Sequence, residues 1–322
     1  AAVALTAAFA LTACGSSATT QQQSNEESKE QTESDKTYKI GVLQLTQHTA
    51  LDKANEGFIA ALDESGIKYE VDQQNASGDQ PTCQTIAEKL VNDGNDLIYA
   101  IATPAAQAVA GMTKDIPIVI SAVTDPAESG LVASNDAPGA NVTGTSDLTP
   151  IGDQIKLLKD VFPDASKVGI LYCSAESNSA IQAEMARQAC TDNGLEAIDF
   201  TVSSTNEIQT VVESMVGKVD VIFAPTDNTI ANGMATVSMV ATDNNLAVIC
   251  GEGGMVEAGG LATYGIDYYK LGHMAGEMAV DILVNGKNPA EMPIQYQPED
   301  EYELSVNEET AAKLNIDMSA FQ

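Results

Sequence analysis

One pattern of strands and helices occurs twice in this sequence, and the duplication constrains the fold more than any other feature. The run YKIGVLQL at 38–45 matches SKVGILYC at 166–173, and NDLIYAIAT at 95–103 matches VDVIFAPT at 219–226. A helical segment and one further strand lie between the members of each pair. The repeated unit is therefore a whole βαβαβ lobe and not a short solenoid repeat. Any α/β protein alternates strands and helices, but here the sequences align over more than one element.

Apolar residues recur every three or four positions in the helical segments, which is the spacing of an amphipathic helix. In the first, one face carries Leu51, Ala54, Phe58, Ala61 and Leu62. This helix should end at Gly66, and the matching helix of the second half should run from about Ser179 to Asn193-Gly194. Later segments continue the alternation, including a helix with Leu271, Met274, Met278 and Ile282 on one side, and a tail that supplies one last strand and a short helix. We expect an α/β protein with two doubly wound, Rossmann-like lobes joined by a hinge.

The loops that follow the strands should face one cleft, because doubly wound lobes bind ligands at the carboxyl ends of their strands. These loops read LTQHTALD, ATPAAQ and AVTDPAES in the first lobe, and SAESNSA, PTDNT and GEGG in the second. They are rich in polar residues, and several precede helix N-termini that offer unpaired backbone N–H groups. This chemistry suits a small polar or zwitterionic solute.

The N-terminus carries a different signal. Residues 1–13 are apolar apart from Thr6 and Thr12, a length that suits the core of a secretory signal and is too short to span a bilayer. The usual cationic start is missing, so we expect truncation at this end. The tetrapeptide LTAC at 11–14 resembles the lipobox of bacterial lipoproteins, in which Cys14 would carry lipid. A signal peptide or short membrane anchor with an unmodified Cys14 is the alternative. The polar segment 15–37 has almost no large apolar residue, which predicts a disordered tether.

Charge and cysteine usage exclude several classes of protein. The 322 residues include 15 Lys and Arg against 46 Asp and Glu, a net charge of −31 that opposes binding to nucleic acid and is typical of a solvated acidic surface. There is no Cys-x-x-Cys and there are only two histidines, so we expect no zinc site. Cys173 should end a strand and Cys190 should lie roughly 15 Å away along the next helix, beyond disulfide reach. Beyond Cys14 we expect four buried free thiols.

Enzyme motifs are also missing from the sequence. No Gly-x-Gly-x-x-Gly follows the first strand, and neither a phosphate-binding Gly-x-x-x-x-Gly-Lys-Ser/Thr nor a Gly-x-Ser-x-Gly occurs. We therefore expect a binding protein without catalytic activity and without a cofactor.

Seven short motifs in this order resemble one known family. They are GVLQLTQHTALD, ATPAAQA, SAVTDP, NVTGTSD, NSAIQ, PTDNTI and YGIDYYKLG. The resemblance covers 38–322 and is to substrate-binding lipoproteins of bacterial ABC importers with the periplasmic-binding type I fold, in the branch associated with tryptophan and tyrosine uptake. It implies a first lobe of 38–147 plus about 268–292, a second lobe of 148–267 plus about 293–322, and a lipid anchor at 1–14 with a tether at 15–37.

The resemblance also implies a function. The protein would be extracytoplasmic, held on the bacterial cell membrane by lipid, and would capture an aromatic L-amino acid between two closing lobes. It would deliver this ligand, as a monomer, to an ABC permease and ATPase. A lipid-anchored ligand-sensing subunit and a binding protein for a sugar or nucleoside are the alternatives. The aromatic content of 5%, without tryptophan, mildly favours an amino acid over a sugar, although Tyr99, Tyr172 and Tyr264 could still line the cleft.

Roles for individual residues follow from their chemistry at the matching positions. Asp227 could pair with an α-ammonium, or could simply cap the next helix. Asn178 and Ser179 could donate to a carboxylate, or could only cap their own helix. His48 could pack against a flat ligand, and Asp125 could fix its own turn before a proline. If Asp227 is only a cap, the alternative ammonium partners are Asp125, Glu252 and Asp267. The full set of candidates is Thr46, Gln47, His48, Thr103, Ala105, Gln107, Val123, Asp125, Asn178, Ser179, Asp227, Asn228, Glu252 and Asp267.

Overall fold

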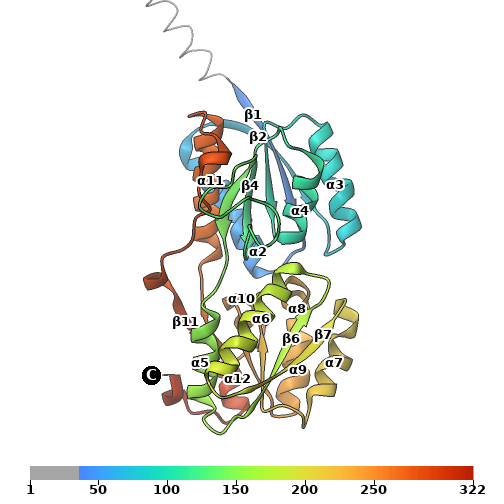
Figure 1. The fold of residues 1–322 in the computed structure, drawn as a ribbon, viewed down its shortest axis with the longest axis vertical. Helices are drawn as coiled ribbons and strands as arrows, with labels where there is room; N and C mark the ends of the chain where they lie inside the picture. The colour runs from blue at the N-terminus through green and yellow to red at the C-terminus, as the bar shows by residue number, and fades with distance from the viewer. Residues whose placement is uncertain (1–35, 322) are drawn as a thin grey trace, which may run out of the picture. The chain divides into compact units, whose positions relative to one another are not determined.

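The computed structural model describes residues 36–321, which form two α/β lobes, each built on its own sheet (Figure 1). The α/β architecture expected from the sequence is confirmed. The expected signal segment at 1–14, the lipidation site Cys14 and nearly all of the expected tether at 15–37 lie outside the described residues. Within 36–321, no helix has the length and apolar character needed to cross a bilayer.

The first sheet has the spatial order β2-β1-β3-β4-β5, and the pairs β1–β3, β3–β4 and β4–β5 are parallel. Its strands are β1 (Thr37–Gln44), β2 (Lys68–Asn75), β3 (Leu97–Ile101), β4 (Ile118–Val123) and β5 (Val142–Ser146). Its helices are α2 (Thr49–Ser65), α3 (Gln80–Asn92), α4 (Thr103–Met112) and α11 (Tyr268–Leu283). The pair α3 and α4 covers one face of the sheet, and the pair α2 and α11 covers the other (Figure 1).

Helix α11 lies against α2, although more than 200 residues separate them in the sequence (Figure 1). The buried face of α2 is the one that the sequence predicted, and the helix ends at Gly66 in the left-handed conformation at φ 71°. Glycines let the two helices approach closely. A Cβ atom on Gly272 would lie 1.9 Å from the carbonyl oxygen of Ala54, and one on Gly57 would lie 1.9 Å from that of Tyr269. The contact therefore depends on residues without side chains.

The second sheet has the order β11-β10-β9-β8-β6-β7 and is parallel except for β11, which runs antiparallel to β10. Its strands are β6 (Lys167–Cys173), β7 (Glu196–Val202), β8 (Val221–Ala224), β9 (Ala247–Cys250), β10 (Ala262–Gly265) and β11 (Glu303–Val306). The helices of this lobe are α5 (Ile151–Val161), α6 (Ser177–Asp192), α7 (Ile208–Met215), α8 (Asn228–Asn232), α9 (Met234–Asp243), α10 (Gly253–Glu257) and α12 (Glu308–Lys313). The short 3₁₀ turns of the chain are η1 (Thr205–Glu207), η2 (Pro289–Glu291), η3 (Glu299–Glu301) and η4 (Met318–Phe321).

Apolar side chains fill both faces of the second sheet, as expected for a doubly wound lobe. One core packs Ile155 and Leu158 of α5 against Val168 and Ile170 of β6. The other packs Ile208 and Met215 of α7 with helix α9 against the opposite face. The last strand and short helix of the tail are present as β11 and α12. Cys83, Cys173, Cys190 and Cys250 are free and buried, which confirms the expectation for these four thiols.

The chain passes between the lobes three times. The crossings lie between β5 and α5 at 147–150, between β10 and α11 at 266–267, and between α11 and β11 within 284–302. Multiple crossings of this kind form a hinge, about which two lobes can close on a ligand. The crossings also place Asp147 and Tyr268 at the boundary between the lobes.

Candidate ligand-binding site

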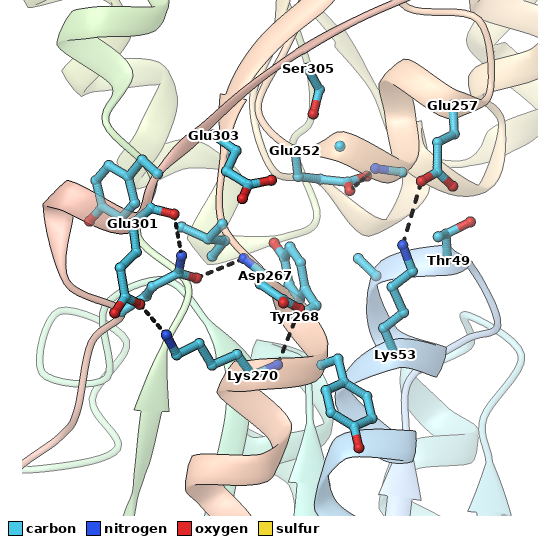
Figure 2. A pocket seen from close by; sticks show the side chains of 18 of the residues that line it. Thr49, Lys53, Glu252, Glu257, Asp267, Tyr268, Lys270, Glu301, Glu303 and Ser305 are labelled. Atoms are coloured by element: carbon cyan, nitrogen blue, oxygen red, sulfur yellow. Dashed lines mark hydrogen bonds and ion pairs between the residues drawn. The ribbon is translucent and has the colours of Figure 1, made fainter.

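A groove of about 750 Å³ lies beside the second and third crossings (Figure 2). Its two lysines each pair with a carboxylate of the lining. Lys53 of α2 lies 3.5 Å from Glu257 of α10, and Lys270 pairs with Glu301. These pairs are largely exposed, and exposed pairs contribute little free energy. The groove is thus a solvated acidic surface on the hinge side. Glu252 and Tyr268 line it and also separate it from a second, enclosed space.

The enclosed space is a cavity at the carboxyl ends of strands from both sheets. Its lining residues are His48, Leu51, Ala122, Asp147, Asn178, Thr226, Asp227, Asn228, Ala231, Glu252 and Tyr268. They lie at or after the carboxyl ends of β1, β4, β5, β6, β8, β9 and β10, the edge at which doubly wound sheets bind ligands. The lining side chains nearly fill this cavity, whose volume is about 10 Å³, far below the range of about 300–1,000 Å³ common for small-molecule sites. A ligand therefore needs the lobes to open, or the lining side chains to move apart, before it can enter.

Buried acceptor atoms without partners line this cavity. Asp147 Oδ1, Asn178 Oδ1 and His48 Nδ1 are buried and make no hydrogen bond to the protein. An unpaired buried polar atom costs about 1–3 kcal/mol unless a water molecule, an ion or a ligand pairs with it. Three of them around one cavity indicate a site that receives hydrogen-bond donors.

Three carboxyl groups face the same cavity, and no Lys or Arg is among the residues that line it. Burial raises the pKa of Asp147 to about 6 and that of Glu252 to about 7. Burial, followed by the nearby Glu176 carboxylate, also raises the pKa of Asp227 above its usual range. Desolvation penalises each anion, and a cation placed among them would relieve that penalty. The electrostatics of the cavity therefore favour a positively charged group.

Hydrogen bonds across the cleft hold the lobes together around the cavity. Gln182 Nε2 of α6 donates to Thr124 Oγ1 of the first lobe at 3.1 Å, and Gln80 Nε2 of α3 donates to the carbonyl oxygen of Ala175 at 2.9 Å. His48 Nε2 lies 3.2 Å from Asn228 Oδ1. These contacts describe a closed arrangement of the lobes.

Comparison with known proteins identifies this arrangement. A family model described as ABC transporter substrate binding protein matches residues 39–320, nearly all of the described chain. The chain belongs to this family. Substrate-binding proteins of ABC importers are extracytoplasmic binding components and not enzymes, so the expected class and location are confirmed at this level.

Individual relatives agree with the assignment. The chain is 45% identical over 297 residues to the tyrosine-binding protein of Clostridioides difficile, covering 91% of this chain and 85% of the relative. It is 39% identical, with a TM-score of 0.85, to a Streptococcus pneumoniae ABC domain solved in complex with L-Trp, covering 89% and 98% of the two chains. A ligand-free, open substrate-binding protein from Clostridium difficile is 43% identical but has a TM-score of only 0.67, covering 87% and 95%. The lobes described here are therefore not in that open arrangement.

Asp227 of this substrate-binding protein caps a helix. Its Oδ1 accepts from the backbone N–H of Ile230 at 2.8 Å, at the start of α8, and its Oδ2 accepts from that of Cys173 at 2.6 Å. The capping role considered from the sequence is thus present. Because each carboxylate oxygen can accept more than one hydrogen bond, the ligand role of Asp227 stays a prediction.

Five of the residues proposed from the sequence line the cavity: His48, Asn178, Asp227, Asn228 and Glu252. The other nine do not: Thr46, Gln47, Thr103, Ala105, Gln107, Val123, Asp125, Ser179 and Asp267. Asp125 fixes its own turn, since its Oδ1 accepts from the backbone N–H groups of Ala127 and Glu128. Asp267 caps α11 in the outer groove. Ser179 is buried, and its hydroxyl oxygen accepts from the Asn178 side-chain amide at 3.3 Å.

Sequence reasoning did not propose the other lining residues, of which Asp147 and Tyr268 are the most polar. The Tyr268 hydroxyl donates to Asp147 Oδ2 at 2.8 Å, which leaves Oδ1 without a partner. Asp147 directly follows the last strand of the first sheet, and this position after a strand could have marked it as a candidate cleft residue. That strand has few apolar residues, so its end was not recognised.

Backbone strain marks the same edge of the first sheet. Ala122 has φ 55° and lines the cavity, and Ala102, which precedes α4, has φ 83°. Residues with a Cβ rarely adopt positive φ, and such strain persists only where the surrounding structure enforces it, most often at binding sites. Ala102 directly follows β3 and Ala122 lies near the end of β4, so both are at the carboxyl ends of central strands.

Proposed function

We propose that this protein captures an aromatic L-amino acid in the enclosed cavity and delivers it to an ABC permease and ATPase. The observation that carries the proposal is the cavity itself, in which three partnerless acceptors and three carboxyl groups converge without Lys or Arg. An α-ammonium supplies three N–H donors and one positive charge. The other candidates proposed from the sequence, including Thr103 and Gln107, would act at the margins of this cleft.

The aromatic class of ligand is favoured by two relatives. One is named for tyrosine, and the other was solved with L-Trp bound. Leu51, Ala122 and Ala231 supply apolar and small side chains against which an aromatic ring can pack. Sugar hydroxyl groups could also donate to these acceptors, but they carry no positive charge to offset the desolvation of the three carboxyl groups.

A ligand screen tests this function. Calorimetry and thermal unfolding of the full chain should show binding of L-tyrosine, L-tryptophan or L-phenylalanine, with a raised melting temperature, because a ligand that binds only the folded state stabilises it by mass action. Sugars and nucleosides at the same concentration should leave the melting temperature unchanged. Closure on the ligand should lower the radius of gyration in X-ray scattering. Preferential binding of a sugar or nucleoside would refute the proposal.

The anchoring and assembly of the protein form a further part of the proposal. The first lobe would comprise 38–147 and about 268–292, and the second 148–267 and about 293–322, on a tether at 15–37. A monomer would be held at the membrane by lipid on Cys14. A sensing subunit would carry the same site, and an adjacent permease and ATPase in the genome would favour transport over sensing.

Lipidation is tested by labelling cells with a fatty-acid analogue. The wild-type chain should be labelled and Cys14→Ser should not, because the motif LTAC ends an apolar run and precedes a polar segment. The Cys14→Ser protein should bind ligand as the wild type does, which serves as the control for folding. Equal labelling of both proteins would remove Cys14 as the anchor.

A further inference from the structure

A chain of three side chains crosses from the second lobe to the first beside the cavity. It starts at Glu176, the residue that precedes α6, which is buried with 4% of its surface exposed. Its Oε1 accepts from the backbone and hydroxyl groups of Thr229, at 2.9 and 2.8 Å. Its Oε2 accepts from the backbone N–H and the side-chain amide of Asn228, at 3.3 and 2.7 Å. Glu176 thus fixes the start of α8.

These contacts determine the orientation of the Asn228 amide. Its NH₂ group must face Glu176, because a carboxylate can only accept and the amide oxygen in that place would meet another acceptor. The amide oxygen Oδ1 is therefore turned toward the first lobe. There it lies 3.2 Å from His48 Nε2.

The orientation of Asn228 determines which nitrogen of His48 carries the proton. An amide oxygen accepts and never donates, so the nitrogen facing it must be the N–H. Burial lowers the pKa of His48, although hydrogen bonding to Asn228 and the charges of Glu176 and Asp52 oppose this shift, so the ring is neutral. A neutral imidazole with hydrogen on Nε2 has a bare Nδ1. Nδ1 is buried without a partner in the protein, and the ring lines the cavity.

We propose that Glu176 is a positioning residue that acts through Asn228 to hold His48 as its Nε2–H tautomer, so that Nδ1 accepts a hydrogen bond from the bound ligand. The inference rests on the proposed function and adds a requirement to it: the ligand presents an N–H or O–H donor at this position. Because His48 and Asn228 belong to different lobes, the tautomer is fixed only when the lobes close. A ligand group that can only accept would meet the lone pair of Nδ1 and be rejected.

Nitrogen NMR of the full chain tests the tautomer directly. The chain has only two histidines, His48 and His273, so ¹⁵N-histidine labelling gives two ring systems, and His273→Gln assigns them. His273 does not line the cavity and pairs with Glu64 on the surface of α2 and α11. With L-tyrosine bound at pH 7, His48 should show the neutral Nε2–H pattern. In Glu176→Gln, whose amide can also donate, Asn228 can turn over and the pattern should change to mixed tautomers. A charged or Nδ1–H His48 in the wild type, or an unchanged pattern in Glu176→Gln, would overturn the inference.

Affinity measurements provide the second readout. His48→Phe keeps a flat ring but removes the acceptor, and it should weaken L-tyrosine binding about two- to tenfold, as expected for one neutral hydrogen bond. The loss should vanish for the analogue that lacks the donor concerned: L-phenylalanine if the donor is the phenol O–H, and the deaminated analogue if it is the ammonium. His273→Gln should bind as the wild type does. Equal losses for all three ligands would contradict the assignment. Failure of the wild type to bind any aromatic amino acid would instead remove the proposed function and the inference with it.

Discussion

Replacing Asp147 with asparagine should weaken the binding of L-tyrosine by at least about thirtyfold. Asp147 is buried at the boundary between the lobes, its Oδ2 accepts from the Tyr268 hydroxyl, and its Oδ1 has no partner in the protein. If the ligand ammonium donates to Oδ1, removing the anion breaks a buried, hydrogen-bonded charge pair, which costs about 2–5 kcal/mol. At about 1.4 kcal/mol for each factor of ten, the lower bound is roughly thirtyfold. Asparagine keeps the size of the side chain and an acceptor for Tyr268.

A double-mutant cycle isolates the contact. Calorimetry would compare the wild type and Asp147→Asn with L-tyrosine and with its deaminated analogue. Removing the amine should weaken binding to the wild type sharply and matter little in the variant. Asp192→Asn, an exposed position near the end of α6, is the matched control and should bind as the wild type does. If both proteins lose the same affinity when the amine is removed, the ammonium lies elsewhere, and Asp227 and Glu252 become its candidate partners.

The variant Gly272→Val should lose about 3 kcal/mol or more of unfolding free energy. A Cβ atom at this position would lie 1.9 Å from the carbonyl oxygen of Ala54 and 2.8 Å from its Cα, so α2 and α11 would have to move apart. Overpacking a core typically costs about 1–3 kcal/mol, and here the obstacle is backbone, which cannot change rotamer. The melting temperature should fall by roughly 6 °C or more.

A second glycine substitution in a helix controls for backbone effects. Gly111 lies in α4, and a Cβ there would meet nothing within 4 Å. Gly111→Ala should therefore raise stability by about 0.5–1 kcal/mol, because alanine favours the helix and loses less backbone entropy on folding. A melting temperature of Gly272→Val within a degree of the wild type would mean that the two helices are not packed as described.

Elements with a strong local pattern could be predicted from the sequence. Helix α2 buries the residues that the helical period selected, and it ends at the glycine that marks its terminus. Cys83 lies on the buried face of α3, and Cys190 shares the small-residue face of α6 with Ala183 and Ala186. These features depend on neighbours three or four residues apart, and such neighbours interact in any context that allows a helix.

Strand β5 shows where local pattern fails. Its sequence VTGTS has one strongly apolar residue and no alternation, yet all five residues are buried. Long-range contacts provide the reason. A Cβ on Gly144 would lie 2.1 Å from the carbonyl oxygen of Ile120, and the Thr143 hydroxyl donates to the carbonyl oxygen of Met292 at 2.7 Å. The partners that bury this strand come from β4 and from a segment about 150 residues later, and the cavity residue Asp147 follows it directly.

The sequence by itself determined the duplicated α/β lobes, the family and the loops that face the cleft, because the spacing of apolar residues and the order of strands can be read directly from the sequence. Only the tertiary structure decided which side chains of those loops meet. Asp125 and Asp147 each follow a strand of the first sheet, but Asp125 turns back onto its own backbone whereas Asp147 faces the cavity. His48 and Asn228 come together only across the closed lobes. The direction of a loop side chain depends on backbone angles and on partners far away in the sequence. Neither of these produces a repeating pattern of residues that could be recognised in the sequence.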